Sequence, residues 1–223
     1  MQGERYLDVK LAVKYLSRDN DLKTLIDHFG VITLKRRRNY FKSLLRSIIH
    51  QQLSSKAAGT IENRFLELYN ASRYPSPEEV LKTPAEVIQN VGISRMKTEY
   101  IRGLAKVIVD RDIRLDKLTE LSNDEVGTVL KQVRGIGQWT VDMFLIFSLN
   151  RPDVFPLNDL GIQKGLMLFL GRAKYLDRES MLSYSEKWKP YRTLVSLYLW
   201  KIVDEGIDIS SQKKPLICEL TLA

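Results

Sequence analysis

The sequence predicts an all-α fold with about ten helices of modest length, and three observations support this class. Apolar residues recur three and four positions apart in most segments, which is the spacing of one face of an α-helix. Residues that favour helix ends flank these segments. Long runs in which apolar and polar residues alternate, the pattern of a half-buried strand, are absent from the sequence.

The N-terminal segment predicts two short helices. The first is amphipathic, with apolar positions at Leu7, Leu11, Val13 and Leu16. Asp21 is the expected N-cap of the second helix, because its carboxylate can accept a hydrogen bond from the first turn. Gly30 is the expected end of that helix. The most strand-like run of the sequence follows at residues 31–34, and it has no evident partner.

The middle of the chain predicts a buried helix and then an amphipathic one. The apolar residues of the buried helix are Phe41, Leu44, Leu45, Ile48 and Ile49. Either Ser54 or Ser55 caps the next helix, whose apolar positions are Ala58, Ile61, Phe65 and Leu68. Pro77 fits the first turn of a further helix, because an N–H group has no helical partner there.

Two more helices precede the most distinctive segment. One extends from Ser94 to about Asp110 and is apolar at Met96, Ile101, Leu104, Ala105 and Ile108. Ser122 and Glu125 have the spacing of a capping box, which begins a helix with apolar residues at Val126, Leu130 and Val133.

Composition narrows the class of function. The 223 residues carry a formal net charge of +8, which favours a polyanionic partner such as nucleic acid. The single cysteine, Cys218, excludes an internal disulfide framework and an iron–sulfur cluster held by four cysteines, and the two histidines make a histidine-rich metal centre improbable. No apolar run reaches the length of a transmembrane helix, and residues 1–10 lack the apolar stretch of a signal peptide. We expect an intracellular protein without a membrane span.

A pair of glycines, Gly135 and Gly137, follows the helix that ends near Val133. A second apolar helix then begins at about Gly137. Glycine permits positive φ and lets a phosphate approach the backbone, and the N–H groups at a helix start attract anions. Two helices joined by a glycine hairpin form the pattern of a clamp that binds DNA phosphates independently of the base sequence. A tight helix–helix turn with no ligand is the alternative interpretation.

A carboxylate stands at the start of a later helix. Asn158 and Asp159 come just before an apolar stretch that includes Leu166 and Phe169. Taken alone, either residue fits the role of a helix N-cap.

Taken together, these segments resemble the helix-hairpin-helix DNA glycosylase superfamily, and within it the 3-methyladenine DNA glycosylase II branch. Further matching stretches are residues 48–54 with Lys56–Ala58, residues 87–94 with Lys97, residues 188–192 and residues 198–200. The resemblance covers about residues 35–205. It implies one domain over residues 1–223, made of two packed helical subdomains with the active site in the cleft between them and the hairpin at about 122–149. A compact form lacking the N-terminal β domain of a bacterial relative is expected.

The resemblance also assigns roles by position. Asp159 matches the catalytic aspartate, which would stabilise an oxocarbenium-like sugar and could activate water. Trp139 and Trp200 match aromatic walls of the base pocket, and Met143 stands where an aromatic residue is common. Aromatic faces attract the positively charged rings of alkylated purines. For these three pocket residues, ordinary core packing is the alternative.

DNA contacts are implied at further positions. Gln52 or Leu53 would fill the gap left by the flipped base, with core packing as the alternative for Leu53. Gly135, Gly137 and Arg134 would meet phosphates, although relatives commonly have proline at the position of Arg134. The backbone carbonyls of Lys131, Val133 and Ile136 would hold a monovalent cation, Na⁺ or K⁺, in the hairpin. No other cofactor is expected.

The implied activity is that of a monofunctional DNA glycosylase, which excises alkylated purines such as 3-methyladenine by hydrolysis of the N-glycosidic bond. We expect a monomer that binds double-stranded DNA with damaged bases, in the cytoplasm and nucleoid or in a nucleus. A glycosylase for deaminated or etheno-modified bases is one alternative. A non-catalytic DNA-binding helix-hairpin-helix module is another, although it would need no carboxylate at Asp159.

Overall fold

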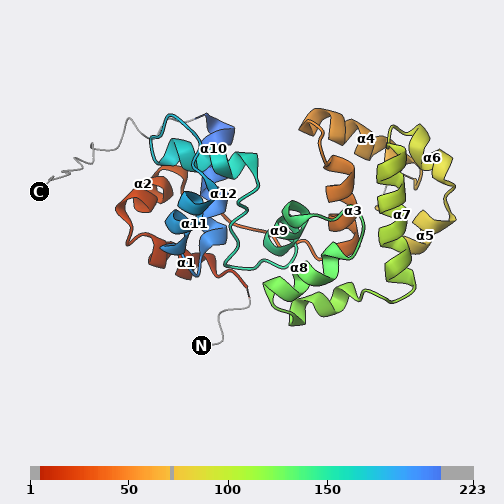
Figure 1. Ribbon diagram of the computed structural model, residues 1–223, viewed down its shortest axis with the longest axis horizontal. Coiled ribbons are helices and arrows are strands. Elements are labelled where there is room, and N and C mark those ends of the chain that lie inside the picture. Colours follow the sequence, from red (N-terminus) through yellow and green to blue (C-terminus); the bar gives the residue numbers. More distant parts are fainter. Residues whose placement is uncertain (1–5, 71–72, 207–223) are drawn as a thin grey trace, which may run out of the picture. The chain divides into compact units, whose positions relative to one another are not determined.

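The fold is helical throughout the part of the chain that the structure describes. The computed structural model describes residues 6–70 and 73–206, and it contains twelve α-helices, one 3₁₀ helix and no strand in this part (Figure 1). The predicted all-α class is therefore confirmed. Cys218 lies outside the described residues.

Helix bounds follow the sequence patterns closely. The helices are α1 Val9–Leu16, α2 Asn20–Phe29, α3 Tyr40–His50, α4 Ser55–Glu67, α5 Pro77–Lys82, α6 Ala85–Asn90, α7 Arg95–Val109, the 3₁₀ helix η1 Leu115–Glu120, α8 Asn123–Lys131, α9 Gln138–Phe147, α10 Leu160–Phe169, α11 Arg178–Glu186 and α12 Arg192–Glu205.

Two compact units divide the chain. One lies within Met1–Leu34 and Arg151–Ala223, and we call it the terminal unit. The other lies within Lys35–Asn150, and we call it the central unit. The terminal unit contains α1, α2 and α10–α12, and the central unit contains α3–α9 with η1.

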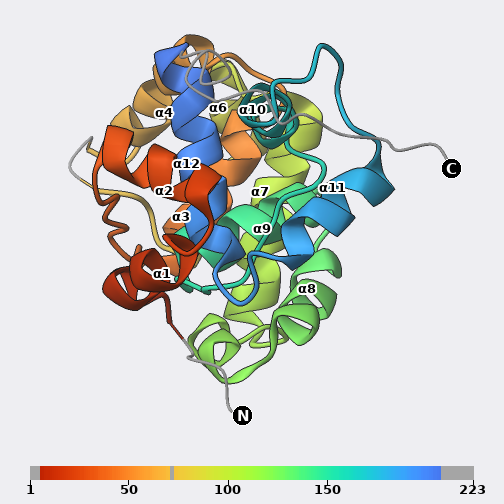
Figure 2. The same cartoon turned by 90° about the vertical axis from the view of Figure 1, so that its left-hand side faces the viewer.

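The terminal unit is built around α12, which packs against α10 and also against α2, the helix that crosses it in Figure 2. A Cβ atom at Gly165 of α10 would lie 2.4 Å from the carbonyl oxygen of Leu199 in α12. This distance is far shorter than a van der Waals contact, so only glycine allows the two helices to approach so closely. Trp188 is fully buried, between the rings of Phe155 and Phe169.

The central unit is built around α3. The apolar residues predicted for this helix are buried, including Leu44, Leu45, Ile48 and Ile49, which have no exposed surface. α3 packs against α4, α7 and α9, and α8 packs against α9. Burial of this face fixes both ends of α3, which is important because the C-terminal end leads into the residues expected to enter DNA.

Several predicted helix ends are confirmed. Ser94 caps α7 with its side chain, Pro77 is in the first turn of α5, and Ser122 and Glu125 form the capping box of α8. Of the two serines proposed for α4, Ser54 is the cap, since its side chain accepts a hydrogen bond from the Ala57 N–H.

Two local expectations were wrong. Asp19, not Asp21, caps α2, because its carboxylate accepts hydrogen bonds from the N–H groups of Asp21 and Leu22. The strand-like run at residues 31–34 forms no strand, in agreement with the predicted all-α class. Leu11 and Met96 were expected on buried faces, but both are exposed, at 41% and 51%. The burial of an apolar residue at the edge of a helix's apolar face depends on which other elements pack nearby, and the helical period does not specify those elements.

Candidate active site and DNA-binding hairpin

The hairpin between α8 and α9 is shaped by two glycines with different requirements. Gly135 has φ of +92°, and a Cβ atom there would lie 2.2 Å from the Tyr100 ring. Glycine is required at this position for both reasons. Gly137 is the N-cap of α9, and a Cβ atom there would meet nothing within 4 Å. The backbone at Gly137 is thus open to a ligand.

The start of α9 carries the features of an anion site. No side chain caps this helix within the described residues. Its first N–H groups can therefore donate hydrogen bonds to an outside partner, and the helix dipole favours a negatively charged one. The side chain of Arg134 is exposed, and its guanidinium lies 3.7 Å from Glu99 and 5.8 Å from the centre of the Tyr100 ring.

The expected cation ligands lie in the same turn. The Val133 carbonyl accepts a hydrogen bond from the Ile136 N–H at 3.0 Å, and the side chains of Val133 and Ile136 are buried. A carbonyl oxygen has a second lone pair, so Val133 could still serve a cation together with the carbonyls of Lys131 and Ile136. Cation binding here stays a prediction.

Gln51 joins the hairpin to the segment that follows α3. Its amide nitrogen donates a hydrogen bond to the Gly135 carbonyl at 2.8 Å. The backbone of this segment is held in turn by Lys97, whose ammonium donates to the carbonyls of Ile49 at 2.8 Å and Gln51 at 2.7 Å. Burial lowers the pKa of Lys97. Gln51 and Lys97 have no predicted role, because nothing in the local sequence indicates that they meet.

The residues expected to enter DNA lie beside one of the expected pocket residues. A hollow of about 490 Å³ is lined by His50, Gln51, Gln52, Leu53 and Trp139. Gln52 has φ of +56°, an uncommon conformation for a residue other than glycine. Leu53 is 37% exposed, so the core-packing alternative for it is wrong. Trp139 is half-buried, and so is Met143, one turn further along α9.

His50 is oriented in this hollow by Glu62, an acidic side chain with no role predicted from the sequence. Nε2 of His50 lies 2.5 Å from Oε2 of Glu62, and Glu62 also accepts hydrogen bonds from Arg46, at 3.1 Å, and from Tyr74. Burial alone would raise the pKa of Glu62, but the hydrogen bonds from Tyr74 and His50 and the charge of Arg46 bring the pKa below its usual value.

Asp159 lies in the terminal unit, where it caps α10. Its Oδ1 accepts hydrogen bonds from the Ile162 N–H at 2.9 Å and from the Trp200 indole nitrogen at 2.8 Å. Asn158 does not cap the helix, and its side chain accepts a hydrogen bond from Arg178 instead. The N-cap interpretation is thus correct for Asp159, but it is incomplete, because the carboxylate also binds a tryptophan from α12.

Gly161 makes room for that pair. A Cβ atom at this position would lie 2.8 Å from Cδ1 of Trp200 and 2.9 Å from Oδ1 of Asp159. The structure therefore brings together two of the predicted site residues, Asp159 and Trp200, and adds Gly161. Trp139 and Met143 belong to the central unit.

This combination defines a class: a helical protein with a glycine hairpin open to an anion and a helix-capping aspartate held by a tryptophan. Residues 45–190 match the family model described as HhH-GPD superfamily base excision DNA repair protein. The chain belongs to this family. No helix among the described residues is long and apolar enough to cross a membrane.

Curated relatives carry glycosylase names. The chain is 39% identical over 162 residues to DNA-3-methyladenine glycosylase 1 of Schizosaccharomyces pombe, covering 72% of this chain and 71% of that protein. It is 28% identical over 220 residues to the putative DNA-3-methyladenine glycosylase YfjP of Bacillus subtilis, covering 91% of this chain and 76% of the relative.

Solved structures that resemble this chain also carry 3-methyladenine glycosylase names. The S. pombe 3-methyladenine DNA glycosylase in complex with abasic DNA superposes with a TM-score of 0.75 at 34% identity, covering 86% of this chain and 96% of that one. The DNA-3-methyladenine glycosidase of Bacillus halodurans gives a TM-score of 0.76 at 35% identity, covering 86% of this chain and 88% of that one. The family predicted from the sequence is thereby confirmed.

Proposed function

We propose that this protein is a monofunctional DNA glycosylase that flips alkylated purines such as 3-methyladenine out of double-stranded DNA and hydrolyses the N-glycosidic bond. The product is an abasic site. One observation carries the proposal: in a chain of this family, the carboxylate of Asp159 is held at a helix start by the indole of Trp200. The names of the relatives support the substrate class.

The chemistry needs a fixed negative charge. Cleavage of the N-glycosidic bond leaves positive charge on the sugar as the base departs. A carboxylate that is already oriented stabilises this charge without reorganising during the reaction. Two N–H donors, from Ile162 and Trp200, hold Oδ1 of Asp159 in one place. Asp159 is the catalytic residue of this proposal, and water is the attacking group.

Aromatic side chains would recognise the damaged base. N3- and N7-alkylated purines carry a positive charge, which the faces of Trp139 and Trp200 would attract, with Met143 contributing apolar contact. The charged base is already a good leaving group, so a general acid is not required. When the base leaves the helical stack, Gln52 or Leu53 would occupy the gap. The exposure of Leu53 and its position beside Trp139 support this role.

DNA would be held by its backbone at the hairpin. The open backbone at Gly137 and the uncapped start of α9 fit a phosphate, and a Na⁺ or K⁺ ion on the hairpin carbonyls would add to this contact. When DNA binds, the Arg134 guanidinium would leave Glu99 and contact a phosphate instead. We propose a monomer that acts inside the cell wherever DNA is repaired.

The monofunctional assignment rests on side-chain chemistry. Bifunctional relatives use a lysine that forms a Schiff base with the sugar, and the matching position here is Trp139, whose indole has no nucleophilic amine. Lys131, the nearest preceding lysine, donates a hydrogen bond to Gln138. Strand cleavage should therefore require alkali or a separate lyase, and borohydride should trap no covalent protein–DNA adduct during turnover.

The decisive experiment is a base-release assay. Methylated duplex DNA is incubated with the protein, and the released bases are identified by chromatography, with the Asp159→Asn variant as control. Release of 3-methyladenine by the wild type alone supports the proposal. Duplexes that contain hypoxanthine or ethenoadenine test the nearest alternative. DNA binding with no base released from any duplex would establish a non-catalytic binding module.

A further inference from the structure

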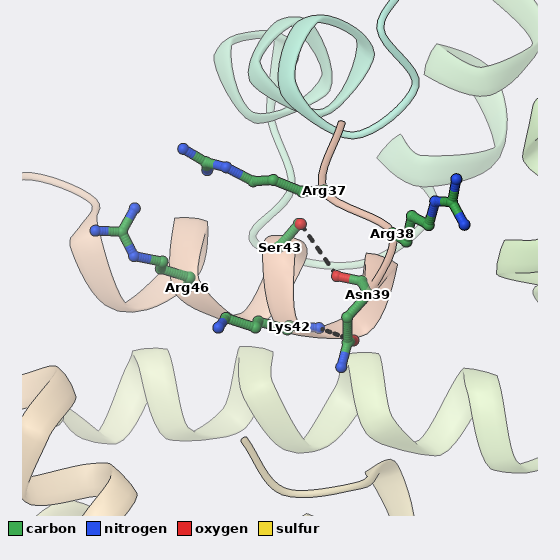
Figure 3. A pocket seen from close by; sticks show the side chains of 6 residues that line it. All are labelled: Arg37, Arg38, Asn39, Lys42, Ser43 and Arg46. Atoms are coloured by element: carbon green, nitrogen blue, oxygen red, sulfur yellow. Dashed lines mark hydrogen bonds between the residues drawn. The ribbon is translucent and has the colours of Figure 1, made fainter. Parts of the chain in front are cut away.

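A basic hollow lies along α3, from the residues just before the helix to Arg46. It has a volume of about 450 Å³ and is lined by Arg37, Arg38, Asn39, Lys42, Ser43 and Arg46 (Figure 3). Four of these six residues are cationic and none is acidic. A hollow with this lining attracts anions, and solvated surface charge is the alternative explanation.

Three of the cationic side chains are directed to the same side. In Figure 3, Arg37, Lys42 and Arg46 extend toward the left of the view, whereas Arg38 extends toward the right. The Arg37 guanidinium lies 4.9 Å from the centre of the Phe147 ring, and its backbone N–H donates to the Phe147 carbonyl at 2.9 Å. The Arg37 side chain is therefore supported in place by α9.

The charge of this group is poorly compensated. Arg46 pairs with Glu62 at 3.1 Å. Among residues 6–70 and 73–206, neither Arg37 nor Lys42 has a carboxylate within ion-pair distance. Partial burial, and after it the positive charge of Arg46, lower the pKa of Arg37, although Glu62 acts in the opposite sense. An anion between the two guanidinium groups would relieve their repulsion.

Local backbone and side-chain contacts shape the hollow around these cations. The Asn39 side chain caps α3 by accepting a hydrogen bond from the Lys42 N–H at 2.9 Å, and the Ser43 hydroxyl donates to the Asn39 carbonyl at 3.1 Å. The Lys42 ammonium lies 4.5 Å from the centre of the Tyr74 ring. These contacts limit the conformational freedom of the side chains, so ligand binding costs less conformational entropy.

We propose that Arg37, Lys42 and Arg46 form a phosphate-binding site separate from the hairpin. Guanidinium groups match the oxygens of a phosphate in a two-pronged geometry, and an ammonium adds a third charge. Arg37 contacts Phe147, the last residue of α9, whereas a phosphate on the hairpin would lie at the first turn of α9. The 10 residues of α9 span about 15 Å at 1.5 Å per residue, so a phosphate on the hairpin does not reach Arg37.

Two sources could supply the phosphate: the backbone of bound DNA or a small phosphorylated compound. The first experiment establishes the site itself. The ¹⁵N resonances of the arginine side chains and of the α3 backbone are followed during titration with pyrophosphate, and a parallel titration uses sodium chloride at matched ionic strength. We expect saturable shifts at Arg37, Lys42 and Arg46 with pyrophosphate alone.

Matched variants test the geometry. Arg37→Gln and Lys42→Gln should each weaken pyrophosphate binding about tenfold or more, the effect of one lost charge-assisted hydrogen bond. Arg38 lines the hollow but extends away from the other three cationic side chains, so Arg38→Gln, which removes the same charge, should weaken binding by less than about threefold. Circular dichroism confirms that each variant is folded. Equal effects of all three variants, or equal shifts with chloride, would overturn the proposal.

The source of the phosphate is assigned by competition. A long duplex with an abasic-site mimic is added to the pyrophosphate complex. Loss of the pyrophosphate shifts at Arg37 identifies the DNA backbone as the ligand, and retention of these shifts beside bound DNA identifies a small phosphorylated compound. Either result supports the phosphate site. Because pyrophosphate binding requires no base excision, failure of this site would leave the proposed glycosylase activity untouched.

Discussion

The indole nitrogen of Trp200 donates a hydrogen bond to Oδ1 of Asp159 at 2.8 Å, although 41 positions separate the two residues in the chain. The same oxygen accepts the Ile162 N–H and so caps α10. The proposed catalytic charge and the capping of α10 thus depend on one carboxylate. A substitution here has to be chosen so that the two roles can be separated.

Asp159→Asn separates them. Asparagine is as good an N-cap as aspartate, so the fold should remain, but the negative charge is lost. We expect base excision to fall roughly a thousandfold or more, whereas binding of DNA with an abasic-site mimic should stay within about threefold. Single-turnover excision and fluorescence anisotropy measure the two quantities. Excision near the wild-type rate would refute the catalytic role.

Trp200→Phe isolates the hydrogen bond to Asp159. The substitution keeps an aromatic ring in place but removes the N–H donor. Since a hydrogen bond to a charged group is worth roughly 1.5–3 kcal/mol, excision of 3-methyladenine should fall by about ten- to a hundredfold, with little change in substrate affinity. Trp200→Ala should be worse because it also removes the aromatic face. If phenylalanine supports the full rate, the N–H group does not position Asp159.

Gly161→Ala tests the space around the same pair. The added methyl group would lie 2.8 Å from Trp200 and 2.9 Å from Asp159, so one of them must move. We expect a loss of about 1–3 kcal/mol in the free energy of unfolding, typical of overpacking, together with slower excision. Gly59→Ala in α4 is the matched control, since nothing lies within 4 Å of its Cβ position. It should stabilise the protein by about 0.5–1 kcal/mol. Urea unfolding of both variants gives the comparison.

Gly137→Asp tests the hairpin. A negative side chain at the start of α9 should repel phosphate, so DNA affinity should fall by about tenfold or more regardless of DNA sequence. Gly137→Ala is the control, because space is available for its methyl group, and it should bind more tightly than the aspartate variant. Anisotropy titrations at several salt concentrations measure the effect. Equal affinity of the wild type and Gly137→Asp would mean that the hairpin is only a structural turn.

Glu62 should make stability depend on pH. Its pKa is lowered in the folded protein, so its stabilising contribution is present above the unfolded pKa and is lost as pH falls through the folded value. We expect Glu62→Gln to cost about 1–3 kcal/mol of unfolding free energy at pH 7, and the difference from wild type should shrink as the pH falls well below 4.5. A difference that stays constant with pH would show that the carboxylate charge plays no part. Urea unfolding at a series of pH values provides the measurement.

The sequence alone determined the helical class, most helix ends and the glycine hairpin, because each depends on residues within a few positions of one another. It also located Asp159 at a helix start, and its resemblance to a known family predicts a catalytic role for that residue. One local error, Asp21 in place of Asp19 as the N-cap of α2, arose because both carboxylates lie close enough to the helix start for the sequence pattern to fit either.

Which distant side chains meet depends on how whole helices pack in the folded protein. The bond from Trp200 to Asp159, the bond from Gln51 to the Gly135 carbonyl and the grip of Lys97 on the end of α3 all join separate helices or loops. The requirement for glycine at position 161 likewise arises from a side chain of another helix, Trp200 in α12. Helical periodicity specifies the face on which a residue lies but not the neighbour that it contacts, since that is set by the packing of whole helices.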